Sequence, residues 1–152
     1  MVTLKKLHEG GFLISKVKQI SGRIFDKMLK AYQITDLNTA QGRIVFSLWQ
    51  NDDIPISQLV KQTALGKTSL TSMLDRLEQV GYVIRKPDEQ DKRKIVISLT
   101  EKSKLLKENY DAVSHDMNSL FYQGLSEDAI DQFEETLKHI LANLNQYEED
   151  NK

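Results

Sequence analysis

Residues 64–81, ALGKTSLTSMLDRLEQVG, decide the fold that we predict for this chain. A short amphipathic segment precedes them; it starts after Pro55, where Ser57 can cap a helix, and ends at a tight break over 64–66. Apolar residues then recur at helical spacing as far as Gly81, a residue type that commonly ends helices. Two short helices joined by a turn that contains Gly are typical of a helix-turn-helix, and we predict one here.

The periodicity changes from helical to alternating directly after this segment. Residues 82–86 are rich in β-prone types, and the polar stretch 87–91 begins with a turn-favouring Pro-Asp pair. Residues 94–99 then alternate, with Ile95, Ile97 and Leu99 on one side. We therefore predict a two-stranded ribbon with a charged tip.

Amphipathic helices flank this central region on both sides. The apolar spacing predicts helices over residues 12–32, 38–51, 100–124 and 126–147. Asn38 and Gln41 form a capping-box pattern, and Thr100 and Ser126 can cap the last two helices. The apolar stripes of the terminal helices are wider than the central module can cover, so we expect a partner chain, with packing inside the chain as the alternative. The predicted fold is mainly α with a small β-hairpin.

The charges are unevenly distributed along the 152 residues, although the net charge is only -1. Residues 61–107 hold 11 Lys or Arg and 6 Asp or Glu, whereas residues 108–152 hold 2 and 11. A basic centre followed by an acidic end indicates a polyanionic partner for one part of the chain, and ordinary solvation of charged faces is the alternative.

Several classes of function are disfavoured by residues that the chain lacks. Without Cys, disulfide scaffolds, thiolate metal sites and Cys nucleophiles are excluded, and the three His are too scattered to suggest a metal site. Neither a Gly-x-Ser-x-Gly motif nor a phosphate-binding loop is present, so we expect no enzyme and no cofactor. No apolar block suits a membrane span or a secretory signal, which leads us to expect a cytoplasmic protein.

The helix-turn-helix and the ribbon both carry candidate DNA-binding residues. In this motif the second helix enters the major groove with its N-terminal half. Short polar or cationic side chains occupy that half, and further cations flank the ribbon, where they can reach phosphates or a neighbouring groove. A solvated helix start and an ordinary hairpin tip have similar compositions, so both alternatives stay open. The candidates are Lys67, Thr68, Ser69, Thr71, Ser72 and Arg76 on the helix, and Arg85, Lys92, Arg93 and Lys94 on the ribbon.

Three segments together resemble the multiple-antibiotic-resistance regulator (MarR) family of winged-helix repressors. They are residues 69–85, SLTSMLDRLEQVGYVIR, then Asp91-Lys92-Arg93, and then Leu99-Thr100-Glu101-Lys102. The most specific part is Asp, any residue, Arg, followed by Leu-Thr at the start of a helix. The flanking helices match in order and length, so the resemblance covers essentially the whole chain. Gln90 and Ser103 depart from it, because an acidic residue and Gly are frequent there in the family.

The resemblance implies a homodimer held together by the first and the last two helices. One MarR-like domain would span 1–152, with a winged helix-turn-helix lobe at 36–101 and helical dimerisation regions at 1–35 and 102–152. Arg93 would reach the minor groove, and Asp91 would brace the wing by pairing with an Arg, for which Arg76 is a candidate. Members of the family often respond to small aromatic or phenolic ligands. Residues that can line such a pocket are Phe12, Phe46, Trp49 and Tyr110, although aromatic residues at helical spacing more often form plain core.

The function that we predict is sequence-specific DNA binding by a transcriptional regulator. We expect a homodimeric repressor that binds an imperfect palindrome with half-sites about one helical turn (~10 bp) apart and is released by a small molecule. The lack of Cys excludes the family branch that senses peroxide through a reactive Cys. The alternatives are a winged-helix module that binds another protein without sequence-specific DNA binding, and a small helical enzyme.

Overall fold

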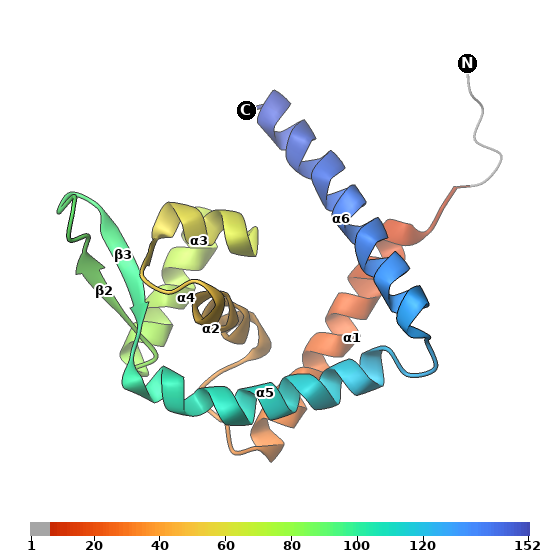
Figure 1. The fold of residues 1–152 in the computed structure, drawn as a ribbon, viewed down its shortest axis with the longest axis horizontal. Coiled ribbons are helices and arrows are strands. Elements are labelled where there is room, and N and C mark those ends of the chain that lie inside the picture. Colours follow the sequence, from red (N-terminus) through yellow and green to blue (C-terminus); the bar gives the residue numbers. More distant parts are fainter. Residues whose placement is uncertain (1–6) are drawn as a thin grey trace. The chain divides into compact units, whose positions relative to one another are not determined.

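The computed structural model describes residues 7–152, and this part of the chain forms six helices and a three-stranded antiparallel sheet (Figure 1). The predicted fold class, mainly α with a small β wing, is confirmed. The chain divides into two compact units, one up to His115 and one from Asp116 onward, which we describe separately. In chain order the elements are α1 (Gly10–Ala31), α2 (Thr39–Gln50), β1 (Ile54–Pro55), α3 (Ile56–Thr63), α4 (Lys67–Gln79), β2 (Val83–Pro87), β3 (Ile95–Leu99), α5 (Glu101–Phe121) and α6 (Glu127–Asp150).

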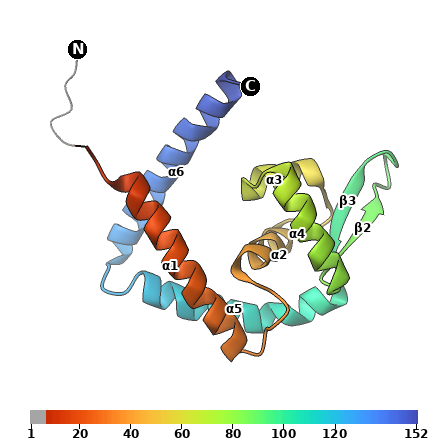
Figure 2. The same ribbon diagram turned by 180° about the vertical axis from the view of Figure 1, so that it is seen from behind.

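The core of the first unit lies where α2, α3 and α4 meet the sheet. Figure 2 shows these three helices gathered beside the ribbon of β2 and β3. Each helix turns its apolar stripe inward, and burial of each large aliphatic side chain contributes about 1.5–3 kcal/mol to folding. The side chains that are completely buried here include Ile44, Leu48, Leu59, Leu70, Leu74, Leu77 and Ile97.

The sheet has β3 at its centre, with β1 and β2 paired antiparallel on either side. The ribbon register runs from Val83 opposite Leu99 to Pro87 opposite Ile95. The prediction of only two strands is wrong, because β1 contributes two residues that pair with β3, too few for an alternating pattern. The prediction that Ser57 caps α3 is also wrong, since α3 begins at Ile56 with Pro55 at the cap position and no side-chain cap.

Most of the predicted helix ends are confirmed. Asn38 and Gln41 form the full capping box of α2, and the side chain of Ser126 accepts a hydrogen bond from Ala129 N–H at the start of α6. Gly81 has φ +87° directly after α4, a conformation that glycine adopts without steric cost. The chain therefore turns sharply at Gly81 from the helix into the wing.

The second unit contains the end of α5 and all of α6. The rings of Phe121, Tyr122 and Phe133 lie 5.0–6.5 Å apart, and the Tyr122 hydroxyl donates to Glu134 at 2.7 Å. None of the α6 residues is buried. The α6 helix therefore keeps a long apolar stripe in solvent, formed by Phe133, Ile140, Leu141, Leu144 and Tyr147.

Candidate nucleic-acid interface

The first two turns of α4 present short polar side chains to solvent. Leu70, Leu74 and Leu77 anchor the opposite side of this helix in the core. The Thr71 hydroxyl donates back to the carbonyl of Lys67 at 2.8 Å, so its oxygen can still accept a hydrogen bond. The five residues predicted in this half are all exposed and lie together on α4: Lys67, Thr68, Ser69, Thr71 and Ser72.

Arg76 lies on a different side of α4 from the wing. It is exposed and lines a polar hollow of about 300 Å³ together with Lys30, Asp36 and other residues at the end of α1 and the start of α2. The structure therefore does not bring Arg76 to Asp91, the pairing for which the sequence made it a candidate.

Arg85 connects the wing strand β2 to α4. Its Nη2 donates to the Asp75 carboxylate at 2.7 Å and to the Thr71 carbonyl at 3.4 Å. Its side chain is only 27% exposed, and its Nε is buried with no hydrogen-bond partner in the described part of the chain. Arg85 thus holds the ribbon against α4 in this structure, and the DNA contact predicted for it stays a prediction.

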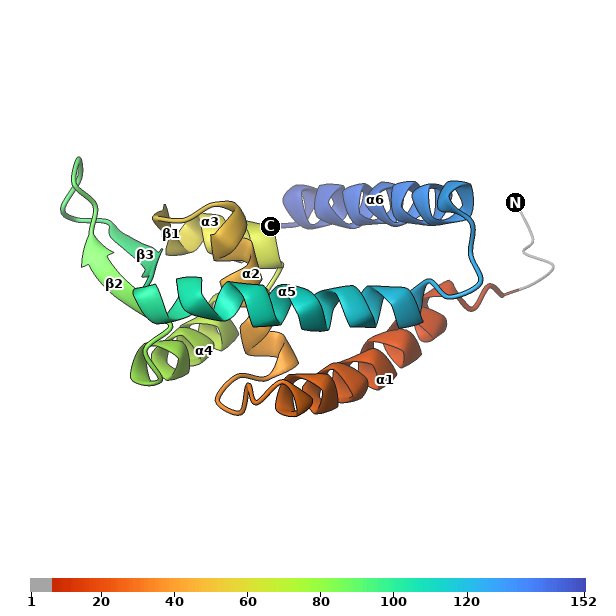
Figure 3. The same cartoon turned by 60° about the horizontal axis from the view of Figure 1, so that its bottom comes forward.

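The loop at the tip of the wing carries exposed cations. Figure 3 shows this loop extending beyond the helices of the lobe. Lys92, Arg93 and Lys94 are all exposed, and the Arg93 guanidinium is paired to Asp91 through Nε at 3.0 Å and Nη2 at 3.2 Å. These bonds, together with one from the Arg93 backbone, hold the pKa of Asp91 below its usual value. The Arg partner of Asp91 is therefore Arg93.

The base of the wing is held by an acidic turn whose role the sequence did not reveal. Asp53, at φ +55°, accepts hydrogen bonds from the Ser98 hydroxyl and from Lys86 at 3.1 Å, and both bonds lower its pKa. Asp52 accepts the backbone N–H of Leu99 at 2.9 Å. The available signal was a run of acidic residues in a turn before a basic ribbon, which predicts pairing but not partners.

The predicted ligand-pocket residues are only partly brought together. Trp49 and Tyr110 meet with ring centroids 5.0 Å apart, and Phe25, which the sequence did not single out, lies 5.6 Å from Tyr110. Tyr110 is buried, which raises its pKa to about 12. Phe46 is 45% exposed and Phe12 67% exposed, and neither makes a ring contact with this cluster in the described structure.

Comparisons with known proteins identify the family. A sequence model of the MarR family matches residues 37–95. The HTH-type transcriptional regulator SarZ of Staphylococcus haemolyticus is 30% identical over 108 residues, which cover 71% of this chain and 72% of that protein. The chain belongs to the MarR family of transcriptional regulators.

Two further matches cover different shares of this MarR-family chain. The organic hydroperoxide resistance transcriptional regulator of Bacillus subtilis is 43% identical over 61 residues, which cover 40% of this chain and 42% of that protein. A crystal structure of a mutant MarR from E. coli, complexed with operator DNA, superimposes with a TM-score of 0.76 at 29% identity, covering 86% of this chain and 92% of that one. The local match is therefore stronger over part of the chain, and the fold match extends over most of it.

The structure accommodates both departures from the MarR pattern. Ser103 stands where Gly is frequent in the family, and it is completely buried with its hydroxyl donating to the carbonyl of Tyr82. Gln90 donates its backbone N–H to the Asp88 side chain at 2.8 Å, an arrangement that needs no particular side chain at position 90. Neither residue disturbs the wing or the start of α5.

Residues 7–152 lack two other kinds of feature. Among these residues no group of three or more His, Cys, Asp or Glu is arranged to hold a metal ion. Within the same range no helix has the length and apolar character that a membrane crossing requires.

Proposed function

We propose that this MarR-family regulator is a homodimeric repressor that binds an imperfect palindrome through α4 and the wing. The observation that carries the proposal is the cluster of five exposed polar or cationic side chains on the first two turns of α4, next to a wing whose tip holds three exposed cations. A helix of this kind fits the major groove and a basic ribbon fits the adjacent phosphates or minor groove. The likeness to the E. coli MarR that was crystallised with operator DNA supports this assignment.

The pairing with Asp91 holds the Arg93 side chain of the wing in a fixed orientation. Asp91 engages Nε and one N–H of Nη2, so three of the five guanidinium N–H groups stay available for DNA. The pairing reduces the rotamer freedom that binding would otherwise remove. The Arg85–Asp75 pair complements this by tying the ribbon to α4, so that helix and wing meet the duplex as one surface.

Exposed apolar stripes support the homodimer. Leu13, Ile14, Val17 and Ile20 lie on α1 with 44–52% of each side chain exposed, and α6 carries a comparable stripe that no described residue buries. Contiguous apolar surface of this kind marks a protein interface. A second copy of the chain covers both stripes, and its two-fold symmetry places two α4 helices on half-sites about one turn (~10 bp) apart.

A small aromatic or phenolic effector completes the proposal. Phe25, Trp49 and Tyr110 provide an aromatic wall, and the buried indole N–H of Trp49 has no hydrogen-bond partner in the described structure. A phenolic or carboxylate oxygen can accept from that N–H. The effector releases DNA only if it binds the released conformation more tightly than the DNA-bound one. We propose neither enzymatic activity nor a membrane partner, and we place the protein in the cytoplasm.

The test is a selection of binding sites from random double-stranded DNA with the purified protein. We expect an enriched palindrome, whose affinity falls steeply as salt rises because bound counterions are released from the phosphates. Absence of enrichment, together with affinity for DNA that does not depend on salt, would refute the proposal and leave a winged-helix module that binds protein.

A further inference from the structure

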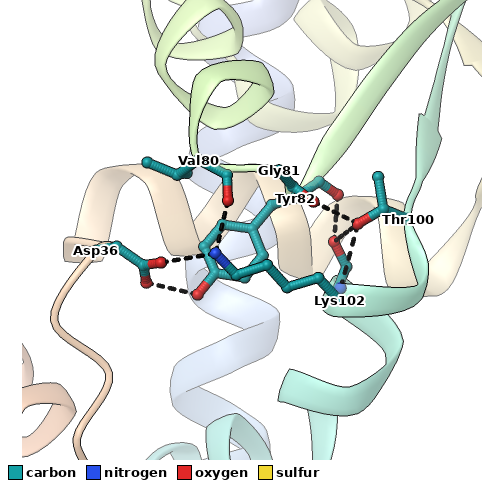
Figure 4. Close-up of polar contacts among 7 residues, drawn as sticks. Asp36, Val80, Gly81, Tyr82, Thr100 and Lys102 are labelled. Carbon is teal, nitrogen blue, oxygen red and sulfur yellow. Dashed lines mark hydrogen bonds and ion pairs between the residues drawn. The ribbon is translucent and has the colours of Figure 1, made fainter.

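One ammonium group joins three separate segments of the first unit. Lys102, the second residue of α5, donates from Nζ to the Asp36 carboxylate at 2.9 Å and to the Val80 carbonyl at 2.6 Å, and Nζ lies 4.5 Å from the centre of the Tyr82 ring (Figure 4). The Tyr82 hydroxyl donates to the other oxygen of Asp36 at 2.5 Å. Asp36 belongs to the connection between α1 and α2, and Val80 is the C-cap residue of α4.

The chemistry of each contact favours this arrangement. The Val80 carbonyl lies at the negative end of α4, where a cation is stabilised by the helix dipole. Burial raises the pKa of Asp36, but the bonds from Tyr82 and Lys102 outweigh this and lower it, so Asp36 stays ionised. Tyr82 itself is buried, and burial together with the neighbouring carboxylate raises its pKa.

The turn after α4 is fixed from the other side by the start of α5. The Thr100 hydroxyl donates to the Gly81 carbonyl at 2.5 Å, and the Tyr82 carbonyl accepts from both the Ser103 hydroxyl and the Thr100 backbone N–H. Backbone carbonyls of 80, 81 and 82 are therefore all bound by residues 100–103. The C-terminal end of α4 therefore makes more hydrogen bonds to the start of α5 than are needed to cap the helix.

We propose that Asp36, Tyr82 and Lys102 form a strut that sets the orientation of α4 relative to the end of α1 and the start of α5, and that these three positioning residues thereby determine the affinity for specific DNA. The inference rests on the proposed function. The strut lies about 12–20 Å along α4 from the residues at its start that are expected to meet the bases, given the helical rise per residue. It acts through the angle of the helix and not by touching DNA.

The test compares Lys102→Met with the control Lys104→Met. Both substitutions remove one positive charge from the first turn of α5. In the described structure the Lys104 side chain makes no hydrogen bond or ion pair and acts on Asp53 only through its charge, and its backbone bond to Thr100 is kept in the variant. Affinity is measured by fluorescence anisotropy on a selected palindrome and on an unrelated duplex, each at several salt concentrations. Thermal unfolding verifies that both variants are folded.

We expect Lys102→Met to weaken binding to the palindrome about tenfold, with binding to the unrelated duplex and the salt dependence as in the control. A salt slope flatter than that of the control by about 1.8, which is about 0.9 for each subunit of the dimer, would mean that Lys102 contacts a phosphate and would overturn the inference. An equal loss on both duplexes would also overturn it, because that pattern indicates a general loss of folded protein. So would affinities equal to those of the control.

A second measurement on the free protein separates the strut from the proposed function. Lys102→Met should speed amide hydrogen exchange at residues 80–82 by about threefold or more, and the control should not. Unchanged exchange would overturn the strut even if the protein binds DNA. Faster exchange with no selective DNA binding by the unsubstituted protein would instead refute the proposed function and leave the strut as a purely structural feature. Asp36→Asn serves as the second variant if Lys102→Met does not fold.

Discussion

Gly42 in α2 allows α2 and α5 to approach closely, and this contact yields a quantitative prediction. A Cβ atom at position 42 would lie 2.6 Å from the hydroxyl oxygen of Tyr110 and 2.9 Å from its Cε2. Tyr110 cannot move away freely, because it is buried and its ring packs edge-to-face on Phe25 and Trp49. Gly42→Ala must therefore force a rearrangement of this aromatic cluster.

The expected magnitude follows from two opposing effects. Replacing Gly by Ala inside a helix stabilises it by about 0.5–1 kcal/mol, whereas inserting a methyl group into a packed core costs about 1–3 kcal/mol. Gly22→Ala in α1 is the matched control, because no atom lies within 4 Å of its added Cβ. The control keeps only the favourable effect. Gly42→Ala should accordingly be less stable than Gly22→Ala by about 1–3 kcal/mol.

The assay is equilibrium unfolding in urea at one fixed protein concentration, since the stability of a dimer depends on concentration. The chain has a single Trp, and Trp49 lies against Tyr110, so its fluorescence reports directly on the affected cluster. Adding Tyr110→Phe to Gly42→Ala removes the nearest clashing atom and should recover part of the loss. Equal stability of Gly42→Ala and Gly22→Ala would refute the argument that α2 and α5 are in close contact.

Three other predictions concern the wing. Arg93→Ala should weaken palindrome binding without changing the dimer, and flatten the salt slope by about 1.8, which is about 0.9 for each subunit, as anisotropy and sedimentation would show. Unchanged affinity at matched salt would contradict the role of Arg93. Asp75→Asn should cost less than about 1 kcal/mol in urea unfolding, because its pair with Arg85 is partly exposed, yet reduce palindrome affinity by loosening the ribbon; a much larger loss of stability would show that the pair is not solvent-screened. Because the pKa of Asp53 is lowered, its contribution to stability is present above the ordinary value of 3.8 and is lost as the pH falls through the folded-state pKa. The unfolding free energies of wild type and Asp53→Asn should therefore converge below about pH 4. A constant difference down to about pH 2 would contradict this.

The local features of this fold were predictable from the sequence because local rules determine them. The apolar stripe of α4 follows from helical spacing, the capping box at Asn38 from a four-residue pattern, and the left-handed stop from Gly81. Each of these depends on residues within one or two helical turns. The Asp91–Arg93 pair is also local, with its partners two residues apart, but the sequence made Arg76 the candidate partner of Asp91, and that candidate was wrong.

The long-range contacts were not predictable, because they depend on which elements meet in space. The Tyr82 hydroxyl reaches Asp36 across 46 residues, and Ser98 reaches Asp53 across 45. Nothing in the spacing of these residues distinguishes them from other polar residues in turns. The strand β1 was missed for a related reason, since two residues acquire strand geometry only by pairing with β3.

The structure also explains why the net charge of residues 61–107 overstates the number of cations that are available to bind a polyanion. Several of its cations already have carboxylate partners that join elements of the first unit: Arg85 with Asp75, Lys86 with Asp53, and Lys102 with Asp36. These pairs hold the ribbon, the sheet and α5 in place, so breaking them to bind phosphate would loosen the surface that binds. Fewer cations are both exposed and located at the start of α4 or the tip of the wing. The attraction to DNA should come mainly from these. They are Lys67, Lys92, Arg93 and Lys94, of which Arg93, with a side chain that is 91% exposed, shares its guanidinium with Asp91.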